Sequence, residues 1–355
     1  MRRPSMRQSW RSIVRLAACL LPALLLGACA PPDFQTSLTA ARPLGPGQIP
    51  YAGLVQDWLV TDDGEALALQ TWLPTDAQSR PVPPRAAIVA LHGFDDYAEE
   101  FADPGTYLAG HGIATFAYDQ RGFGHSAHSG LWPGVETLKQ DLRTAIRLVR
   151  SRLPGIPVYA LGCSMGGAVV LATLADGGPD LPDGAILAPP AVWARETQPL
   201  INRAALWAGV RVIPEMRFTG RGLGIQASDN IPMLRALGRD PLYIHATRTD
   251  AIYGLVNLMD EALTGASKVT EPLLVLYGAK DHVIPKAPIA DLMARLPRTE
   301  DGAQRLAYYA NGWHLILRDL DRRKVDDDLV AWINDHRAPL PSGADRAAAH
   351  FPPAS

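Results

Sequence analysis

Hydrophobic positions divide the chain into short apolar runs separated by segments of helical length. Six such runs stand apart, at Ala86–Leu91, Ile113–Tyr118, Val158–Leu161, Ala185–Ala188, Leu273–Tyr277 and Leu306–Tyr309. Continuous apolar runs of this length are typical of parallel strands that are buried on both faces. The intervening segments are long enough for crossover helices, and Val135–Leu153 has the clearest helical periodicity. The pattern predicts an α/β fold, a mostly parallel twisted sheet with helices on both faces.

Two segments depart from this alternation. Val55–Val60 and Ala66–Trp72 flank the turn sequence Asp62-Asp63-Gly64, which predicts an N-terminal antiparallel hairpin. Between Ala188 and Glu271 the chain has helical stretches but no convincing strand. We interpret residues 190–265 as an inserted helical cap.

The first residues have the pattern of a targeting segment. A basic stretch to Arg15 precedes the apolar run Leu16–Leu26, which is too short to span a bilayer. We therefore expect residues 1–28 to be a signal peptide. The sequence Leu26-Gly27-Ala28-Cys29 resembles the lipobox of bacterial lipoproteins, which implies that Cys29 carries the lipid. An ordinary signal peptide, or a buried N-terminal helix with Cys29 incidental, is the alternative. Ala30 favours an outer-membrane, periplasm-facing protein.

The remaining boundaries follow from composition. Residues 29–50 are rich in proline and are interpreted as a tether. Residues 51–337 form the predicted folded body, which includes the cap, and residues 338–355 are predicted to be a flexible tail. Cys163 is the one cysteine of that body, so no disulfide is expected in it.

Charge and motif content exclude several classes of protein. The chain has a net charge of −2, with 47% hydrophobic and 20% charged residues, which is the composition of a globular protein and argues against a nucleic-acid binder. No His and Cys cluster has metal-ligand spacing, and no phosphate-binding glycine loop is present. We therefore expect neither a metal nor a cofactor. The oligomeric state is left open.

A candidate nucleophile lies between a predicted strand and a predicted helix. Gly162-Cys163-Ser164-Met165-Gly166 follows the run Val158–Leu161 directly and precedes the helix-compatible run Gly167–Leu174. This is the context of a nucleophile elbow, a sharp strand-to-helix turn that holds the serine exposed and requires glycines at its flanks. The alternative role for Ser164 is that of a helix N-cap.

A serine hydroxyl needs a base, and the base needs an acid that fixes its tautomer. His314 follows the last predicted strand in the sequence Ala310-Asn-Gly-Trp-His314, and Asp281 follows the preceding strand. Both loops are expected at the carboxyl edge of the sheet, together with Ser164. The order Ser, Asp, His is that of the α/β-hydrolases.

Other histidines fit the role of base less well. His282 adjoins Asp281 but neighbouring side chains point apart, and His125 is best explained as part of a turn braced by Asp119 and Arg121. His92 is expected to brace its loop.

An oxyanion site needs two backbone N–H groups beside the nucleophile. Met165 supplies one as the residue after Ser164. We assign the other to Phe94, in the sequence His92-Gly93-Phe94 after the run that ends at Leu91.

Together these motifs resemble the monoacylglycerol lipase and lysophospholipase-like branch of the α/β-hydrolases, of serine aminopeptidase S33 type. The motifs are His92-Gly93-Phe94, Tyr118-Asp-Gln-Arg-Gly-Phe-Gly-His-Ser126, Gly162-Cys-Ser-Met-Gly166, Asp281-His-Val-Ile-Pro285 and Gly312-Trp-His314. The resemblance implies a serine hydrolase with the triad Ser164, Asp281 and His314. It leaves the acyl-chain and head-group specificity open.

We therefore predict a lipid-anchored carboxylic ester hydrolase whose substrates are monoacylglycerol or lysophospholipid-like esters. Apolar cap residues either line an acyl groove or form the core of the cap, and the candidates are Trp207, Ile213, Met216, Ile225, Met233, Leu234, Tyr253, Leu255 and Met259. A peptidase or an acyltransferase with the same triad, or a noncatalytic binding lipoprotein, is the alternative. An aminopeptidase should have an acidic cluster in the cap, and Asp229, Asp240 and Asp250 are scattered.

Overall fold

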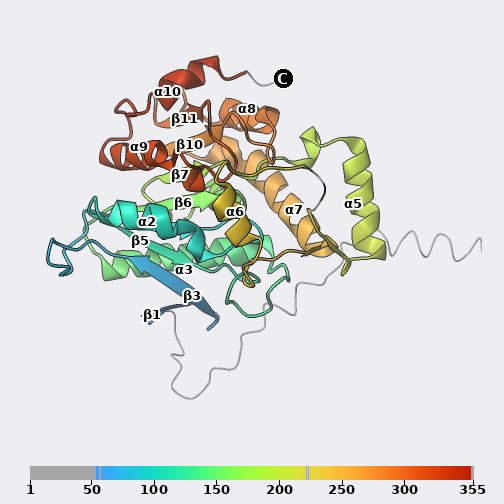
Figure 1. Ribbon diagram of the computed structural model, residues 1–355, viewed down its shortest axis with the longest axis horizontal. Helices are drawn as coiled ribbons and strands as arrows, with labels where there is room; N and C mark the ends of the chain where they lie inside the picture. The colour runs from blue at the N-terminus through green and yellow to red at the C-terminus, as the bar shows by residue number, and fades with distance from the viewer. Residues whose placement is uncertain (1–52, 56, 221, 223, 353–355) are drawn as a thin grey trace, which may run out of the picture.

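The computed structural model describes residues 53–55, 57–220, 222 and 224–352 (Figure 1). The predicted signal peptide, Cys29 and the tether of residues 29–50 lie outside the described residues. Among the described residues, no helix has both the length and the apolar character needed to cross a membrane.

Within this part of the chain, nine strands form one sheet in the order β1-β2-β3-β5-β4-β6-β7-β10-β11. Their bounds are β1 Gly53–Val55, β2 Trp58–Val60, β3 Ala66–Trp72, β4 Ala86–Leu91, β5 Ile113–Tyr118, β6 Val158–Cys163, β7 Ala185–Ala188, β10 Leu273–Gly278 and β11 Gln304–Tyr309. β5, β4, β6, β7, β10 and β11 pair with their neighbours in parallel, whereas the β1–β2, β2–β3 and β3–β5 pairs are antiparallel. The predicted fold class and hairpin are confirmed.

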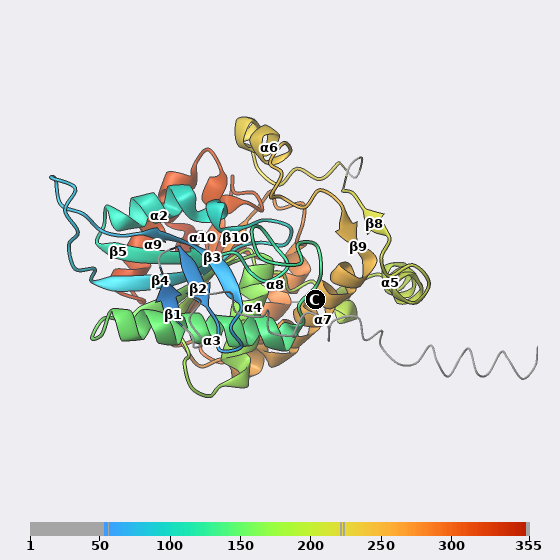
Figure 2. The same cartoon turned by 90° about the horizontal axis from the view of Figure 1, so that it is seen from below.

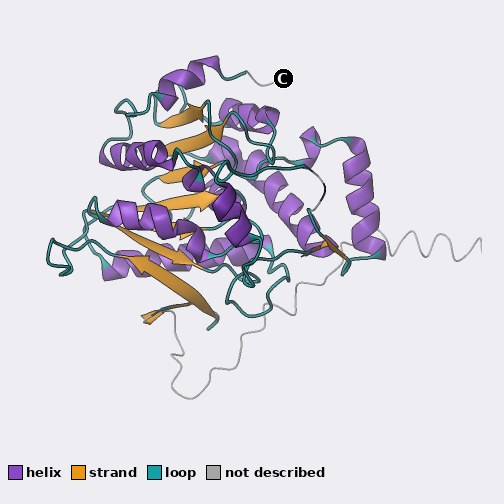
Figure 3. Cartoon of the chain, in the orientation of Figure 1, coloured by secondary structure: helices purple, strands orange, loops and turns teal. Residues whose placement is uncertain are grey.

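Burial explains why the apolar runs became strands. Every residue of β4, β5, β6, β7 and β10 is buried, because helices cover both faces of the sheet (Figure 3). The helices α3 (Val135–Arg152), α4 (Met165–Asp176), α7 (Thr249–Gly265) and α8 (Lys286–Arg295) contribute to the core on one face. The helices α2 (Ala102–Ala109) and α9 (Arg322–Asn334) contribute to the core on the other face (Figure 2).

Helix α3 follows directly from its sequence. Leu138, Leu142, Ile146 and Val149 recur at three- and four-residue spacing, and all four are buried against the sheet. Arg150 and Arg152 lie in the last turn, where positive charge interacts favourably with the helix dipole. The helix ends at Arg152, one residue before the predicted boundary at Leu153.

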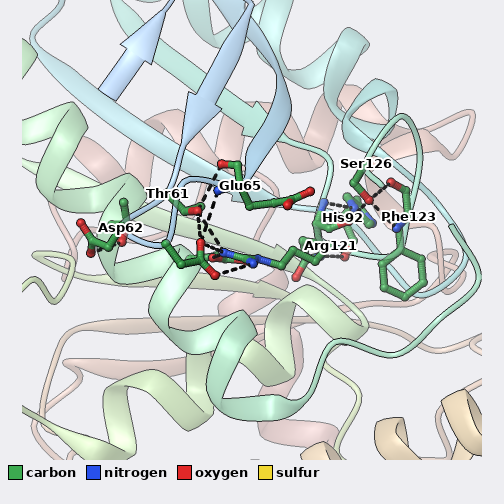
Figure 4. A network of polar contacts seen from close by, with 11 residues as sticks. Thr61, Asp62, Glu65, His92, Arg121, Phe123 and Ser126 are labelled. Carbon is green, nitrogen blue, oxygen red and sulfur yellow. Dashed lines mark hydrogen bonds and ion pairs between the residues drawn. The ribbon is translucent and has the colours of Figure 1, made fainter. Parts of the chain in front are cut away.

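A buried arginine joins the hairpin to α3 (Figure 4). Arg121 donates from Nε and Nη2 to the carboxylate of Asp141 at 2.7 and 2.9 Å. It also donates to both oxygens of Asp63 at 2.7 and 2.6 Å, and to the Thr61 hydroxyl at 3.0 Å. The expectation that Arg121 braces this region is met, but its partners come from the hairpin turn and from α3.

The segment between β7 and β10 holds the residues predicted as a cap, 190–265, but its last helix, α7, packs in the core beside α4, so the predicted cap includes a helix of the body. It contains η3 (Arg195–Thr197), α5 (Leu200–Val212), α6 (Ile231–Leu237), α7 and the two-residue strands β8 (Arg217–Phe218) and β9 (Thr247–Arg248). The β8–β9 pairing was not expected, because two-residue strands leave no period in the sequence. Helix α5 lies apart from the sheet in both views (Figures 1 and 2).

The C-terminal segment differs from the flexible tail that its composition suggested. Residues 338–352 lie over β11, where Leu340 is buried and the Phe351 ring packs on Tyr277 and Tyr308. Helix α10 (Ala344–Ala347) and η6 (Ala348–His350) belong to this segment. The packing has a physical reason, because Leu340 and Phe351 cover apolar surface that the last strand would otherwise expose.

Candidate active site

Ser164 occupies the turn between β6 and α4. Its backbone has a φ of 47° and a ψ of −109°, in a region that residues other than glycine rarely adopt. The Ser164 N–H donates to the Ala188 carbonyl at 2.8 Å, and its own carbonyl accepts from Ala191 N–H at 2.9 Å. The loop after β7 therefore holds this strained residue, as a nucleophile elbow requires.

The flanking glycines are needed because the turn presses against neighbouring backbone. A Cβ at Gly162 would lie 2.5 Å from the Gly166 carbonyl carbon. A Cβ at Gly166 would lie 2.1 Å from the Leu91 carbonyl oxygen, at the end of β4. No side chain fits at these distances, so the glycine spacing has a steric cause.

Asp281 and His314 lie in contact at the carboxyl edge of the sheet. The loops that follow the paired parallel strands β10 and β11 bring His314 Nδ1 to 2.9 Å from Asp281 Oδ2. The other carboxylate oxygen of Asp281 accepts the N–H groups of Val283 and Ile284 at 2.7 and 2.9 Å. The Asp281 side chain is fully buried and that of His314 is 7% exposed. The carboxylate fixes the imidazole with Nδ1 as donor and Nε2 as a possible base.

Ser164 lies at the same edge of the sheet, since β6 is separated from β10 only by β7. Among the described residues, no hydrogen bond joins the Ser164 hydroxyl to His314. Such bonds are often long without substrate and shorten when it binds. The structure thus brings Asp281 and His314 into contact and places Ser164 at the same carboxyl edge of the sheet.

The loop after β4 passes beside Ser164. A Cβ at Gly93 would lie 3.5 Å from Ser164 Cβ, and the next residue, Phe94, packs its ring against Phe123. Within the described part of the chain, no protein group accepts the N–H of Phe94 or of Met165. The first N–H belongs to the residue after Gly93 and the second to the residue after Ser164.

His92 braces this loop and is not placed to act as a base. Its Nδ1 donates to the Gly93 carbonyl at 2.7 Å, and its Nε2 accepts the Gln120 N–H at 2.9 Å. Burial lowers the pKa of His92, so the ring is neutral in this tautomer. His125 pairs with Asp119 at 3.0 Å, and His282 packs on the Trp313 ring. These placements agree with the structural roles expected for them.

Sequence reasoning missed a buried polar cluster beneath the Gly93 loop. Glu100 Oε2 accepts the Gly93 N–H at 2.7 Å, and Arg318 pairs with Asp96 at 2.9 Å. Burial raises the pKa of Glu100, with a further contribution from the nearby Asp96 carboxylate. The acid-rich run after Phe94 was the available signal, but Arg318 is more than two hundred residues away along the chain.

Among the described residues, no group of three or more His, Cys, Asp or Glu side chains could hold a metal ion. Cys163 is a buried free thiol whose pKa is raised by burial. It is therefore a poor nucleophile in this setting.

The site can be compared with known proteins. A family model described as serine aminopeptidase, S33, matches residues 82–321. The chain belongs to this family. It is 27% identical over 287 residues to a monoacylglycerol lipase of Mycolicibacterium smegmatis, which covers 77% of this chain and 94% of the relative. It is 26% identical over 299 residues to the monoglyceride lipase of Homo sapiens, covering 82% and 94%.

Solved structures agree on the fold. The Paleococcus ferrophilus monoacylglycerol lipase aligns with a TM-score of 0.63 at 20% identity, covering 76% of this chain and 99% of the other. A soluble variant of monoglyceride lipase from Saccharomyces cerevisiae aligns with a TM-score of 0.67 at 18% identity, covering 83% and 99%. The chain is thus an enzyme of the α/β-hydrolase fold, in the branch that contains the monoacylglycerol lipases.

Proposed function

We propose that this hydrolase cleaves carboxylic esters through an acyl-enzyme on Ser164. The observation that carries the proposal is the buried His314–Asp281 hydrogen bond at the sheet edge where Ser164 stands in its strained turn. The names of the two relatives, a monoacylglycerol lipase and a monoglyceride lipase, support a lipid ester as substrate.

The residues divide the chemistry among them. Ser164 Oγ attacks the ester carbonyl while His314 Nε2 takes its proton, and the oxyanion accepts hydrogen bonds from the N–H groups of Phe94 and Met165. Collapse of the tetrahedral intermediate expels the alcohol, which receives the proton from His314. Water then attacks the acyl-enzyme with His314 again as base, which releases the acid and restores the serine. Asp281 holds the imidazole through Nδ1 and stabilises the imidazolium.

The surface of the cap supports a lipid-like substrate. Leu200, Ile201 and Val212 on α5 are 74–77% exposed, and Trp207 on the same helix is 52% exposed. Several large apolar side chains of one helix thus face away from the protein core. We infer that acyl chains or a lipid surface contact α5, and that monoacylglycerols or lysophospholipid-like esters are the substrates.

The charged residues of the cap do not favour an aminopeptidase. Asp229 accepts the Leu320 N–H, Asp240 accepts the Tyr97 hydroxyl, and Asp250 pairs with Arg248. Each carboxylate has its own protein partner, so the three offer no common site for a substrate amine.

The decisive experiment compares the purified protein with its Ser164→Ala variant on monoacylglycerols and simple esters of increasing acyl length. We expect turnover that rises with acyl length and is absent from the variant. Equal hydrolysis by both proteins, or hydrolysis of none of the esters by the folded wild type, would refute the proposal.

We further propose that Cys29 is lipidated and that the enzyme is held at the outer membrane, facing the periplasm. The mass of the mature N-terminal peptide tests this directly. A diacylated Cys29 is expected, with release of the protein from membranes in the Cys29→Ser variant. A mature chain that begins elsewhere would contradict it.

A further inference from the structure

The loop that carries His314 is held by a segment of the cap. This loop runs from Ala310 to Asp321, between β11 and α9, and it faces residues 227–230, between β8 and α6. The Leu315 N–H, next to His314, donates to the Ala227 carbonyl at 2.8 Å. The cap therefore contacts the residue that follows the proposed base.

The residue that precedes His314 is held through Asp319. Asp319 Oδ2 accepts the Trp313 N–H at 2.8 Å, and Asp319 Oδ1 accepts the Ser228 hydroxyl at 2.6 Å. Asp319 is 2% exposed and Ser228 is fully buried. Burial raises the pKa of Asp319 to about 6, so it is mainly a carboxylate at neutral pH and accepts both bonds.

Two further hydrogen bonds close the contact between cap and loop. Asn230 Nδ2 donates to the Arg318 carbonyl at 3.0 Å, and the Leu320 N–H donates to Asp229 Oδ1 at 2.9 Å. Four residues in succession on the cap thus bond to one loop. In these bonds Ser228 contacts Asp319, and Asp319 contacts the backbone N–H of Trp313. Any role of the two residues in the reaction is therefore exerted through His314.

We propose that Asp319 and Ser228 are positioning residues, which form a polar clasp between the cap and the His314 loop and so set the position of the base. The inference rests on the proposed function of His314. It gives the cap a role in the reaction, because the cap then supports the proposed base. A small shift of a catalytic group is costly, since proton transfer needs hydrogen-bond geometry.

The chain offers a matched control away from the cap. Ser342 donates its hydroxyl to Asp328, and Asp328 also accepts the Ser342 N–H at 2.9 Å and the Tyr309 hydroxyl at 2.7 Å. This pair has the same chemistry as Ser228 and Asp319, but it joins α9 to the C-terminal segment.

The first test is kinetic, with a small water-soluble ester that does not depend on acyl contacts in the cap. We expect the acylation rate to fall about tenfold in Ser228→Ala and in Asp319→Asn, with little change in KM. The double variant should lose no more than either single variant, because the two residues act as a unit. Ser342→Ala, at an equal or greater loss of thermal stability, should keep the wild-type rate. The proposal would be overturned if the acylation rates of the two single variants, the double variant and Ser342→Ala all fell in proportion to their losses of thermal stability.

The second test needs no substrate, so it separates failure of the clasp from failure of the proposed function. The proton that His314 Nδ1 shares with Asp281 is observable by NMR far downfield, and the His314→Gln variant assigns it. We expect this resonance to broaden or shift in Ser228→Ala and Asp319→Asn and to persist in Ser342→Ala. An unchanged resonance in the clasp variants would overturn the proposal even if the protein hydrolysed esters. Full activity of Ser164→Ala would refute the proposed function alone.

Discussion

Two glycines without any chemistry of their own determine whether Ser164 can stand at the edge of the sheet. Gly162 and Gly166 lie where the turn presses on backbone atoms, which cannot move away as a flexible side chain can. The strain at Ser164 is therefore sustained by contacts on both sides of it. A substitution at either glycine should act on the whole turn.

We expect Gly166→Ala to lower the free energy of unfolding by about 3 kcal/mol, because the added Cβ would overlap the Leu91 carbonyl oxygen. Chemical denaturation measures the loss. Gly220→Ala is the control, since a Cβ there meets no atom within 4 Å. Similar stabilities of the two variants would contradict the steric argument.

A second residue-scale feature is the carboxyl group of Asp95, next to Phe94. Its backbone φ is 68°, its Oδ2 accepts the Thr247 hydroxyl at 2.6 Å, and its Oδ1 is buried with no partner among the described residues. Burial raises the pKa of Asp95 to about 7, against the smaller opposing effect of Thr247. The folded protein therefore keeps a proton that the unfolded chain releases near pH 4.

This difference destabilises the fold as pH rises. The contribution of Asp95 is most favourable below pH 4 and is lost progressively up to about pH 7. Between pH 5 and pH 7 the loss is on the order of 2 kcal/mol. We expect Asp95→Asn to reduce the loss of unfolding free energy between pH 5 and pH 7 by this amount, as measured by urea titration at both pH values.

Asp76→Asn serves as the control for that slope. Hydrogen bonds from Arg80 lower the pKa of Asp76, so this carboxyl, whose side chain is 26% exposed, is ionised in both states throughout the window. Its variant should follow the wild type between pH 5 and pH 7. An Asp95→Asn variant that did the same would show that Asp95 is ionised in the folded protein.

At the scale of elements, Arg121 connects three parts of the fold that are distant in the sequence. It joins the hairpin turn at Asp63, the loop after β5 and helix α3 at Asp141 (Figure 4). Asp141 is 2% exposed, so it depends on this one guanidinium to offset the cost of its burial. The planar fork of arginine suits two carboxylates at once, which a lysine does not.

We expect Arg121→Met to lower the free energy of unfolding by about 3 kcal/mol, because it leaves the buried Asp141 carboxylate without a partner. Arg80→Met breaks the Arg80–Asp76 pair, in which the arginine side chain is 72% exposed, and should change stability by less than about 0.5 kcal/mol. Thermal and urea unfolding measure the stability changes in both variants. Equal losses would show that the burial of Asp141 is unimportant.

At the scale of the whole molecule, the C-terminal segment is part of the folded body. It covers β11, and Phe351 packs on Tyr277, whose hydroxyl donates to the Ile284 carbonyl at 2.7 Å. That carbonyl belongs to the loop that also donates N–H groups to Asp281. The segment therefore completes the packing of β10 and β11.

We expect Leu340→Ala to cost about 3 kcal/mol in unfolding free energy and to expose the C-terminal segment to limited proteolysis, because Leu340 is fully packed. Leu320→Ala removes the same atoms from a side chain that is 66% exposed and should be neutral. A Leu340→Ala variant as stable and as protease-resistant as Leu320→Ala would show that the segment is dispensable.

Much of the candidate site could be inferred from local signals. Ser164, Asp281 and His314 lie three, four and five residues after the ends of predicted strands, and parallel strands bring such positions to one edge of the sheet. Asp319 and Ser228 could not be found in this way. Each resembles an ordinary loop residue, and their pairing depends on where the cap lies over the sheet.

The sequence by itself determined the parallel strands, the helix α3, the strand-to-helix turn at Ser164 and the order of the three candidate site residues, because each depends on periodicity or on a turn a few residues long. Only the tertiary structure decided which charges pair, as with Arg121 and Asp63 or Arg318 and Asp96, and that the C-terminal segment packs on β11. The physical reason is that a residue's type shows whether its side chain requires burial or a charged partner, but not which other residue supplies the contact. The partner is chosen when distant segments meet and the buried groups must be satisfied together.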